Sequence, residues 1–270
     1  MSVRIWHQSI SELDHLPAYR AMLSEHARRV TRPSTVVDLH GMRAGTYPSG
    51  AAPIDVLANP WCHYLANLQI VDGVTRAEAE GYDAVAITCF HDPALHEARS
   101  VVDIPVVSMC ESTVLLSCSV GARLGLVGIG PANVELVADR VRHYGLSGRV
   151  AAIVALETAV NEHDVDAEFS EPGAMRRSFQ TAARKVIAAG ADVVVPCESL
   201  LNTSLVRQGV TAVDDVPVVD SLAIMLTHAE SLVQLRRTTG LSVSRAGEAA
   251  RPDPAGVRAL RAAAAATLAD

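Results

Sequence analysis

Aromatic residues are scarce in this 270-residue chain, at 4% of the sequence, and no stretch reaches the roughly 18 consecutive apolar residues that cross a bilayer. A basic run is also lacking, since charged residues make up 20% and the formal net charge is -7. Nucleic acids and anionic membrane surfaces bind clustered lysines and arginines, so neither is an expected partner. A small-molecule substrate is the expected partner.

The sequence has neither a C-x-x-C pair nor an even set of cysteines. Its first residues, MSVRIWHQSI, contain no apolar stretch of signal-peptide length, which predicts a cytoplasmic protein. Thiols stay reduced in that compartment, so the five cysteines predict neither a disulfide framework nor a zinc site. They are Cys62, Cys89, Cys110, Cys118 and Cys197. The glycine run at 125–130 predicts no dinucleotide site, because it is followed by Pro131 and lacks the later acidic residue of such a site.

What the chain does contain is an alternation of short apolar runs with longer stretches rich in Ala, Leu, Arg and Glu. The runs predict strands at residues 3–7, 35–39, 84–88, 105–109, 124–129, 150–156, 192–196 and 216–219. The longer stretches predict helices at 18–30, 59–80, 94–101, 112–121, 133–144, 174–189, 200–208, 222–235 and 255–268, with a loop at 238–254. Such alternation is typical of a doubly wound α/β fold with parallel sheets.

Two blocks of the sequence resemble each other. GYDAVAITCF at 81–90 matches GADVVVPCES at 190–199, and IPVVSMCES at 104–112 matches VPVVDSLAI at 216–224. Cys197 lies 108 positions after Cys89, and Pro217 lies 112 positions after Pro105. Matched blocks in the same order indicate a duplication. We therefore expect two pseudo-symmetric lobes, one formed by residues 1–113 plus 222–270 and the other by 114–221, with the active site in the cleft between them.

Cys89 and Cys197 are the candidate catalytic residues. Both are predicted at the carboxyl ends of strands, where open α/β sheets bind ligands, and each precedes a predicted helix whose N–H groups stabilise a thiolate. A single strand-end cysteine is usually only a small buried apolar residue. Equivalent positions in a repeat favour a functional pair. Cys62, Cys110 and Cys118 lack such a partner, and we expect them to be structural.

The chain resembles the aspartate/glutamate/hydantoin racemase superfamily over roughly residues 3–230, and hydantoin racemases most. The motifs that carry the resemblance are CFHDPAL at 89–95, IPVV at 104–107, CES at 110–112, PCES at 196–199 and VPVVD at 216–220, with the opening IWHQS at 5–9.

The resemblance implies two lobes, no cofactor and two acid/base cysteines. One cysteine removes a proton alpha to a carbonyl, and the other supplies a proton on the opposite face of the planar intermediate. The expected substrate is a small amino-acid-, amide- or hydantoin-like molecule. Hydrogen-bond donors are needed for the developing enolate oxygen. Backbone N–H groups after each cysteine are expected to serve, together with Ser9, Ser112 and Ser199.

The remaining candidate substrate-binding residues flank the cysteines or follow other strands: His40, Tyr47, Phe90, His91 and Glu198. Tyr47 belongs to a glycine- and proline-containing loop at 41–50 that also holds Arg43 and Thr46. His91 and Glu198 depart from the hydantoin racemase pattern, which has small residues there. These bulky, ionisable side chains argue against hydantoin itself, and the acidic Glu198 is expected to raise the pKa of Cys197.

Several alternatives stay open at this point. Maleate-type cis–trans isomerases and arylmalonate-type decarboxylases belong to the same superfamily. A metal-dependent hydrolase could use the strand-end residues His7, His40, Cys89 and His91, although their spacing fits no known ligand pattern. A non-catalytic binding protein would have no need of paired thiols. We expect a homo-oligomer, since duplicated lobes of this type often associate.

Overall fold

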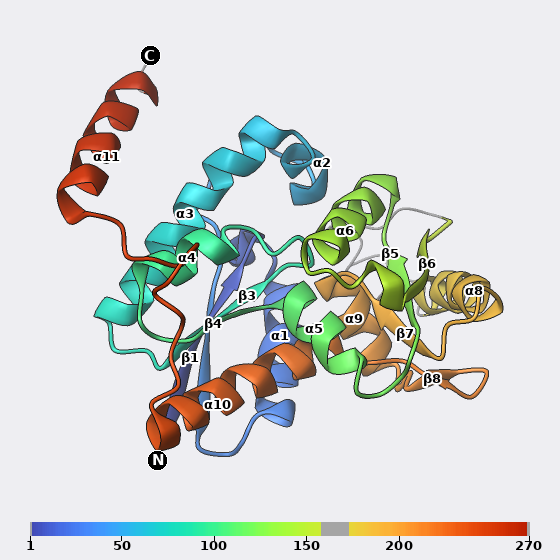
Figure 1. Ribbon diagram of the computed structural model, residues 1–270. Coiled ribbons are helices and arrows are strands. Elements are labelled where there is room, and N and C mark those ends of the chain that lie inside the picture. The colour runs from blue at the N-terminus through green and yellow to red at the C-terminus, as the bar shows by residue number, and fades with distance from the viewer. Residues whose placement is uncertain (1, 158–172, 269–270) are drawn as a thin grey trace.

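The computed structural model describes residues 2–157 and 173–268. It contains two parallel β-sheets that lie side by side, each with helices packed against it (Figure 1). The larger sheet has the order β2-β1-β3-β4, with β1 at Val3–Ser9, β2 at Thr35–His40, β3 at Ala84–Thr88 and β4 at Val106–Ser108. The smaller sheet has the order β6-β5-β7, with β5 at Leu124–Gly128, β6 at Val150–Ala155 and β7 at Val193–Pro196.

Side chains of the larger sheet alternate between two buried faces. Ile5 and Ala86 belong to a core cluster shared with the smaller sheet, whereas Trp6 and Ile87 belong to a second cluster on the opposite face. Helices α1 (Pro17–Val30), α5 (Met109–Ser117) and α10 (Ser221–Thr239) cover the first face, and α3 (Pro60–Ala79) and α4 (Leu95–Val101) cover the second. Burial on both faces explains why each strand is an almost continuous apolar run.

The smaller sheet repeats this topology. Its central strand β5 pairs with β6 and β7, as β1 pairs with β2 and β3, and a parallel bridge between Val194 and Val218 supplies the equivalent of β4. Its helices are α6 (Pro131–His143), α8 (Ala174–Ala188) and α9 (Ser199–Arg207). The α/β fold with two pseudo-symmetric parallel sheets, predicted from the internal similarity, is confirmed.

The other elements are short or peripheral. They are the 3-10 turns η1 (Leu13–His15) and η2 (Ser147–Arg149), helix α2 (Pro53–Leu57), the antiparallel pair β8 (Ala212–Val213) and β9 (Val216–Pro217), and helix α11 (Pro254–Leu268). Helix α10 packs on α1, α5 and β3, which supports our proposal that the first lobe takes back the chain at residue 222. Helix α11 extends away from the body (Figure 1).

One predicted boundary was wrong in a way that affects the site. The sequence predicted a strand through Met109 and a helix from Ser112, but β4 ends at Ser108 and α5 begins at Met109. Cys110 is therefore in the first turn of a helix. Cys118, expected in the middle of a helix, is the residue that follows α5.

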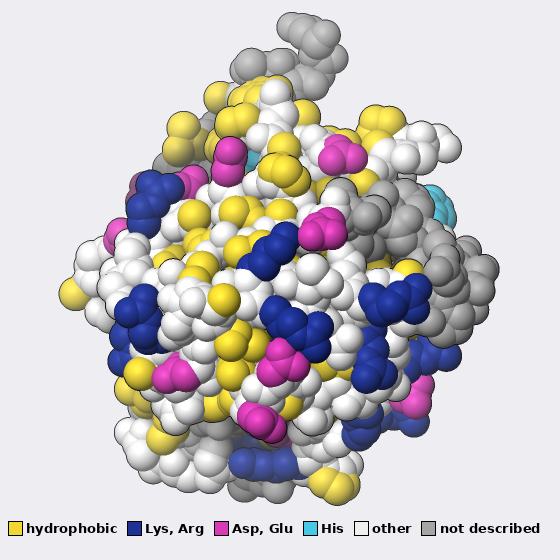
Figure 2. All heavy atoms as spheres, turned by 90° about the vertical axis from the view of Figure 1, so that its right-hand side faces the viewer, with side chains coloured by type: hydrophobic (Ala, Val, Ile, Leu, Met, Phe, Trp, Pro, Cys, Tyr) yellow, Lys and Arg dark blue, Asp and Glu magenta, His cyan; other side chains and the backbone are white. Residues whose placement is uncertain are grey.

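Within residues 2–157 and 173–268, no helix combines the length and apolarity needed to cross a membrane. On the face in Figure 2, acidic side chains lie among the arginines and lysines. Helix α8 makes two ion pairs with other segments, Arg184 with Asp214 and Lys185 with Glu157.

Candidate active site

Cys89 and Cys197 occupy corresponding positions in the two sheets. Cys89 directly follows β3, and Cys197 directly follows β7. Their exposed fractions are 6% and 0%, and all five cysteines are thiols rather than disulfides. The sequence repeat thus places two buried sulfur atoms at the carboxyl ends of equivalent strands, where ligand sites of open α/β sheets form.

A tight loop follows Cys89. Its backbone N–H at His91 donates to the Cys89 sulfur over 3.4 Å, and Asp92 and Ala94 adopt left-handed φ angles of 46° and 55°. Such angles are costly for residues other than glycine and persist where neighbouring contacts fix them. Helix α4 begins only at Leu95, so the local N–H group, and not the helix N-terminus, is the donor at this sulfur.

Asp92 provides the contacts that fix this loop. Its carboxylate accepts hydrogen bonds from the backbone N–H groups of Cys110 and Glu111, both 2.9 Å long, and from the Tyr144 hydroxyl at 2.5 Å. Burial raises the pKa of Asp92 to about 6, although these donors oppose the shift. The carboxylate is therefore charged at pH 7 and joins the Cys89 loop to the start of α5.

The Cys197 thiol faces its own strand. Its sulfur donates to the Val195 carbonyl over 3.4 Å, and its backbone N–H donates to the Val127 carbonyl over 2.8 Å. Burial raises the pKa of Cys197 well above its usual value, and a backbone hydrogen bond from Val127 offsets only part of the rise. Burial thus opposes the stabilisation of a Cys197 thiolate that we expect from the N-terminus of α9, and that expectation stays a prediction.

Glu198 does not account for this shift. Its side chain turns to the start of α9, where it accepts a hydrogen bond of 2.8 Å from the Leu201 N–H and caps the helix. Capping carboxylates satisfy backbone donors that a helix N-terminus leaves unpaired. The acidic neighbour of Cys197 is thus a structural group, and burial is the main cause of the raised thiol pKa.

The two cysteine loops are connected by a residue that was not among the predicted site residues. Asn133, in the first turn of α6, donates from Nδ2 to Nε2 of His91 over 3.0 Å and to the carbonyl of Cys197 over 3.3 Å. His91 is buried, and this burial lowers its pKa to about 3. Its ring is therefore neutral, and an Nε2 that accepts from an amide leaves the proton on Nδ1. The only advance signal was an asparagine three residues after Gly130, beside a strand end.

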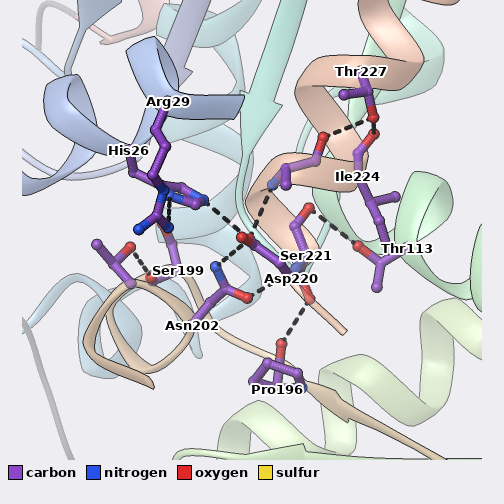
Figure 3. A network of polar contacts seen from close by, with 12 residues as sticks. His26, Arg29, Thr113, Pro196, Ser199, Asn202, Asp220, Ser221, Ile224 and Thr227 are labelled. Carbon is purple, nitrogen blue, oxygen red and sulfur yellow. Dashed lines mark hydrogen bonds and ion pairs between the residues drawn. The ribbon is translucent and has the colours of Figure 1, made fainter. Parts of the chain in front are cut away.

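A third thiol lies near the pair. Cys110 is buried, and its pKa is raised mainly by desolvation, next by the charge of Asp92 and further by its closeness to the two other thiols. At the offset of 112 positions, the counterpart of Met109, the first residue of α5, is Ser221, the first residue of α10. Figure 3 shows that Ser221 donates through its hydroxyl to the Pro196 carbonyl, over 3.1 Å, and through its N–H to Asn202. Each cysteine loop is thus fastened to the helix that follows the neighbouring strand.

Other predicted substrate-binding residues hydrogen-bond within the protein or belong to its core. Ser112 shares a hydrogen bond of 2.9 Å with His228, and Ser199 accepts one of 2.7 Å from Tyr19. Ser9 accepts one of 3.0 Å from the Ser11 N–H, and Phe90 is buried in the shared core cluster. A serine hydroxyl that accepts keeps its own hydrogen for a further partner.

His40 and Tyr47 line two separate hollows. His40 stacks on Trp6, with 3.3 Å between ring centroids, and faces a hollow of about 360 Å³ next to α3. Tyr47 donates to the Ile10 carbonyl over 2.6 Å and lines another hollow, of about 240 Å³. Neither lining includes Cys89 or Cys197 among the residues that the structure describes. Both residues therefore stay predictions as substrate contacts.

The four residues considered as metal ligands have different partners. His7 hydrogen-bonds Thr88 over 2.6 Å, His40 stacks on Trp6, and His91 meets Asn133. In the part of the chain that is described, no three His, Cys, Asp or Glu side chains are arranged to hold a metal ion.

Comparison with known proteins agrees with this geometry. The family model described as Asp/Glu/Hydantoin racemase matches residues 22–229. A hydantoin racemase of Pseudomonas sp. (strain NS671) is 30% identical over 179 residues, which cover 65% of this chain and 68% of that protein. A hydantoin racemase of Paenarthrobacter aurescens is 31% identical over 190 residues, covering 70% and 76%.

Solved structures show the same fold. An allantoin racemase from Klebsiella pneumoniae superposes with a TM-score of 0.75 at 23% identity and covers 93% of this chain and 94% of its own. An allantoin racemase from Pseudomonas fluorescens has a TM-score of 0.72 at 24% identity, with 93% and 98% covered. The family model spans well over half of the chain, and the chain therefore belongs to the Asp/Glu/hydantoin racemase family of isomerases.

Proposed function

We propose that this protein racemises a small hydantoin-like substrate at the carbon alpha to its carbonyl, without a cofactor, and that Cys89 and Cys197 are its two acid/base residues. The main support for this proposal is the position of the two buried thiols at the ends of β3 and β7, with their loops joined through Asn133. Inversion needs acid/base groups on both faces of a planar intermediate, and two related lobes can supply one each.

The proton transfers follow from the environments of the thiols. Because Cys197 has a raised pKa, it carries its proton in the resting enzyme at neutral pH. The Cys89 thiolate removes the alpha proton from one enantiomer, which leaves an enolate, and the Cys197 thiol then protonates the opposite face. The enzyme ends with a Cys89 thiol and a Cys197 thiolate. Proton exchange with water, or turnover of the other enantiomer, restores the starting state.

A hydantoin-like ring is the substrate class that we favour. The two curated relatives described above are named hydantoin racemases and are about 30% identical to this chain. In the sequence, the bulk and ionisable character of His91 and Glu198 argue against hydantoin as the substrate. In the structure His91 is neutral and hydrogen-bonded to Asn133, and Glu198 caps α9, which weakens that objection. Ser9, Ser112 and Ser199 are the proposed donors to the enolate oxygen.

The test follows single enantiomers of 5-monosubstituted hydantoins and of allantoin in deuterated water at pH 7, by circular dichroism and by proton NMR of the alpha position. The wild-type protein is expected to racemise at least one of them and to incorporate deuterium. Cys89→Ser and Cys197→Ser should each lower kcat by at least about 100-fold, since each removes one proton-transfer group.

Cys118→Ser is the matched control. This cysteine lies just after α5 and donates to the Val114 carbonyl, so its loss should leave racemisation unchanged. Full racemase activity in either Cys89→Ser or Cys197→Ser would refute the two-thiol mechanism. Turnover of maleate or of arylmalonates, with none of the hydantoins or allantoin, would assign the site to another reaction of the superfamily.

A further inference from the structure

Asn133 hydrogen-bonds to residues of both cysteine loops, His91 after Cys89 and Cys197 itself. We propose that Asn133 is a positioning residue. It fixes the relative positions of the Cys89 and Cys197 loops, so that both thiols can reach the same substrate carbon. The inference rests on the two-cysteine mechanism proposed above. It assigns no proton transfer to Asn133 itself.

The hydrogen-bonding capacity of the Asn133 carboxamide is directed at these two loops. Its two amide hydrogens have two acceptors, Nε2 of His91 and the backbone carbonyl of Cys197. Its Oδ1 accepts from the Ile129 N–H over 3.1 Å. The residue is 1% exposed, so water does not compete for these bonds. One side chain thus links the loop after β3, the loop after β7 and the chain just after β5.

The chemistry of His91 fits this arrangement. The desolvated ring is neutral, so Nε2 carries a lone pair toward the Asn133 amide. The same residue donates its backbone N–H to the Cys89 sulfur. One residue, His91, thus contacts Asn133 through its ring and the first thiol through its backbone.

Gly128 explains how the carboxamide reaches this position. A Cβ at residue 128 would collide with Oδ1 of Asn133 and would lie 3.0 Å from Cγ2 of Val134. The glycine at the end of β5 therefore leaves the space that the Asn133 side chain occupies. This gives a structural role to one member of the glycine run at 125–130, which we found unsuited to a dinucleotide.

The relative position of the thiols matters because both must reach the same carbon from opposite faces. A misplacement of about 1 Å can lower a rate roughly 100-fold. If the relative position of the two thiols changes, Cys89 can still remove the alpha proton. It can then return a proton that has exchanged with solvent to the same face of the carbon. Deuterium then enters the substrate without inversion.

The experiment measures inversion and deuterium incorporation together for Asn133→Ala, starting from one enantiomer in deuterated water. We expect kcat for inversion to fall about 10- to 100-fold with KM within about threefold, and the ratio of exchange to inversion to rise about tenfold. Asn133→Asp is the second variant, since it keeps the shape and the acceptor for Ile129 but has at most one donor, on a protonated carboxyl, in place of two. It should show the same defect, and it covers the case in which the alanine variant does not fold.

Glu230→Ala is the matched control. Glu230 is 3% exposed and also makes two side-chain hydrogen bonds, from the Arg32 N–H over 3.0 Å and from the Thr35 hydroxyl, but these join α10 to the start of β2, at the edge of the sheet opposite Cys89. It should lose thermal stability with an unchanged ratio of exchange to inversion. An equal rise of that ratio in Glu230→Ala would show general loosening and overturn the proposal.

A double-mutant cycle with Gly128→Ala provides an independent check. Gly128→Ala should reproduce the defect by displacing the carboxamide. In the double variant Gly128→Ala/Asn133→Ala the collision with Oδ1 is absent and only the contact with Val134 remains, so the second substitution should add little. Fully additive losses would mean that Gly128 does not act through Asn133 and would count against the assigned geometry.

The reactivity of the thiols tests the positioning role of Asn133 independently of racemase activity. If the wild-type protein racemises none of the substrates, the function has failed, but alkylation by iodoacetamide still reports on the loops. Asn133→Ala should then speed alkylation of both Cys89 and Cys197, mapped by mass spectrometry, by about tenfold, with Cys118 unchanged. Unchanged rates at both thiols, or in an active enzyme an unchanged ratio of exchange to inversion, would overturn the positioning role.

Discussion

The hydroxyl of Tyr144 donates a hydrogen bond of 2.5 Å to the carboxylate of Asp92, and this bond connects the end of α6 with the loop that follows Cys89. The same carboxylate accepts from the first turn of α5 through two backbone N–H groups. One buried acid therefore holds together segments that belong to the two different sheets. The strained φ angle of Asp92 is stabilised by these three donors.

Tyr144→Phe removes one of the three donors. The phenyl ring conserves the packing, so the expected loss is that of one hydrogen bond to a buried charged group, about 1.5–3 kcal/mol in the free energy of unfolding. Urea denaturation measures it. Tyr64→Phe, at an exposed tyrosine of α3, is the control and should leave the midpoint unchanged. Equal midpoints for Tyr144→Phe and the wild type would contradict a stabilising role for this bond.

The raised pKa of Asp92 predicts a pH dependence of stability. Its pKa is about 6 in the folded protein and 3.8 in the unfolded chain, so the folded state binds more protons between these values. By linkage, the contribution of Asp92 to stability is largest below about pH 4 and falls as the pH rises toward 6. We expect the stability difference between the wild type and Asp92→Asn to shift by about 3 kcal/mol over this range.

Denaturant titrations of both proteins at several pH values test this prediction. The free energy of unfolding of the wild type should rise relative to that of Asp92→Asn as the pH falls from 7 to 4. A gain in the opposite direction would mean that the three donors depress the pKa of Asp92 more than burial raises it.

Much of the fold could be predicted because buried parallel strands are distinctive apolar runs, and because the repeat gives each strand a partner. The start of α5 could not. The residues from Val106 to Cys110 are all compatible with a strand, and an apolar run does not reveal where the backbone changes from extended to helical. The error concerned one helical turn, yet it determines that Cys110 lies beside Asp92.

The predictions for the site show a second limit. A residue at a strand end is placed at one edge of a sheet, but the rule does not say how far along that edge it lies. His40 is the last residue of β2, which is separated from β3 by β1, so it lies about two strand spacings, roughly 10 Å, from the end of β3. Asn133 was missed for the opposite reason, since its partners are 42 and 64 residues away and only tertiary packing brings them together.

The last prediction concerns Arg99 and Glu111, which stabilise the start of α5. The guanidinium of Arg99 makes two parallel hydrogen bonds to the Glu111 carboxylate, of 2.9 and 2.5 Å, and its Nε donates to the Val106 carbonyl over 3.1 Å. Burial alone would raise the pKa of Glu111, but the bonds and charge of Arg99 lower it. The pair therefore stabilises the fold above about pH 4.5 and loses this contribution as the pH falls further.

Arg99→Met leaves a buried, uncompensated carboxylate, and we expect a loss of about 3 kcal/mol at pH 7. Arg99→Met/Glu111→Leu removes both charges and should recover most of that loss, because a buried pair is often no better than apolar packing of similar volume. Arg142→Met breaks an exposed pair with Asp139 and should cost less than about 1 kcal/mol. A double variant as unstable as Arg99→Met would show that the arginine acts mainly through the Val106 carbonyl, and the end of β4, rather than through Glu111.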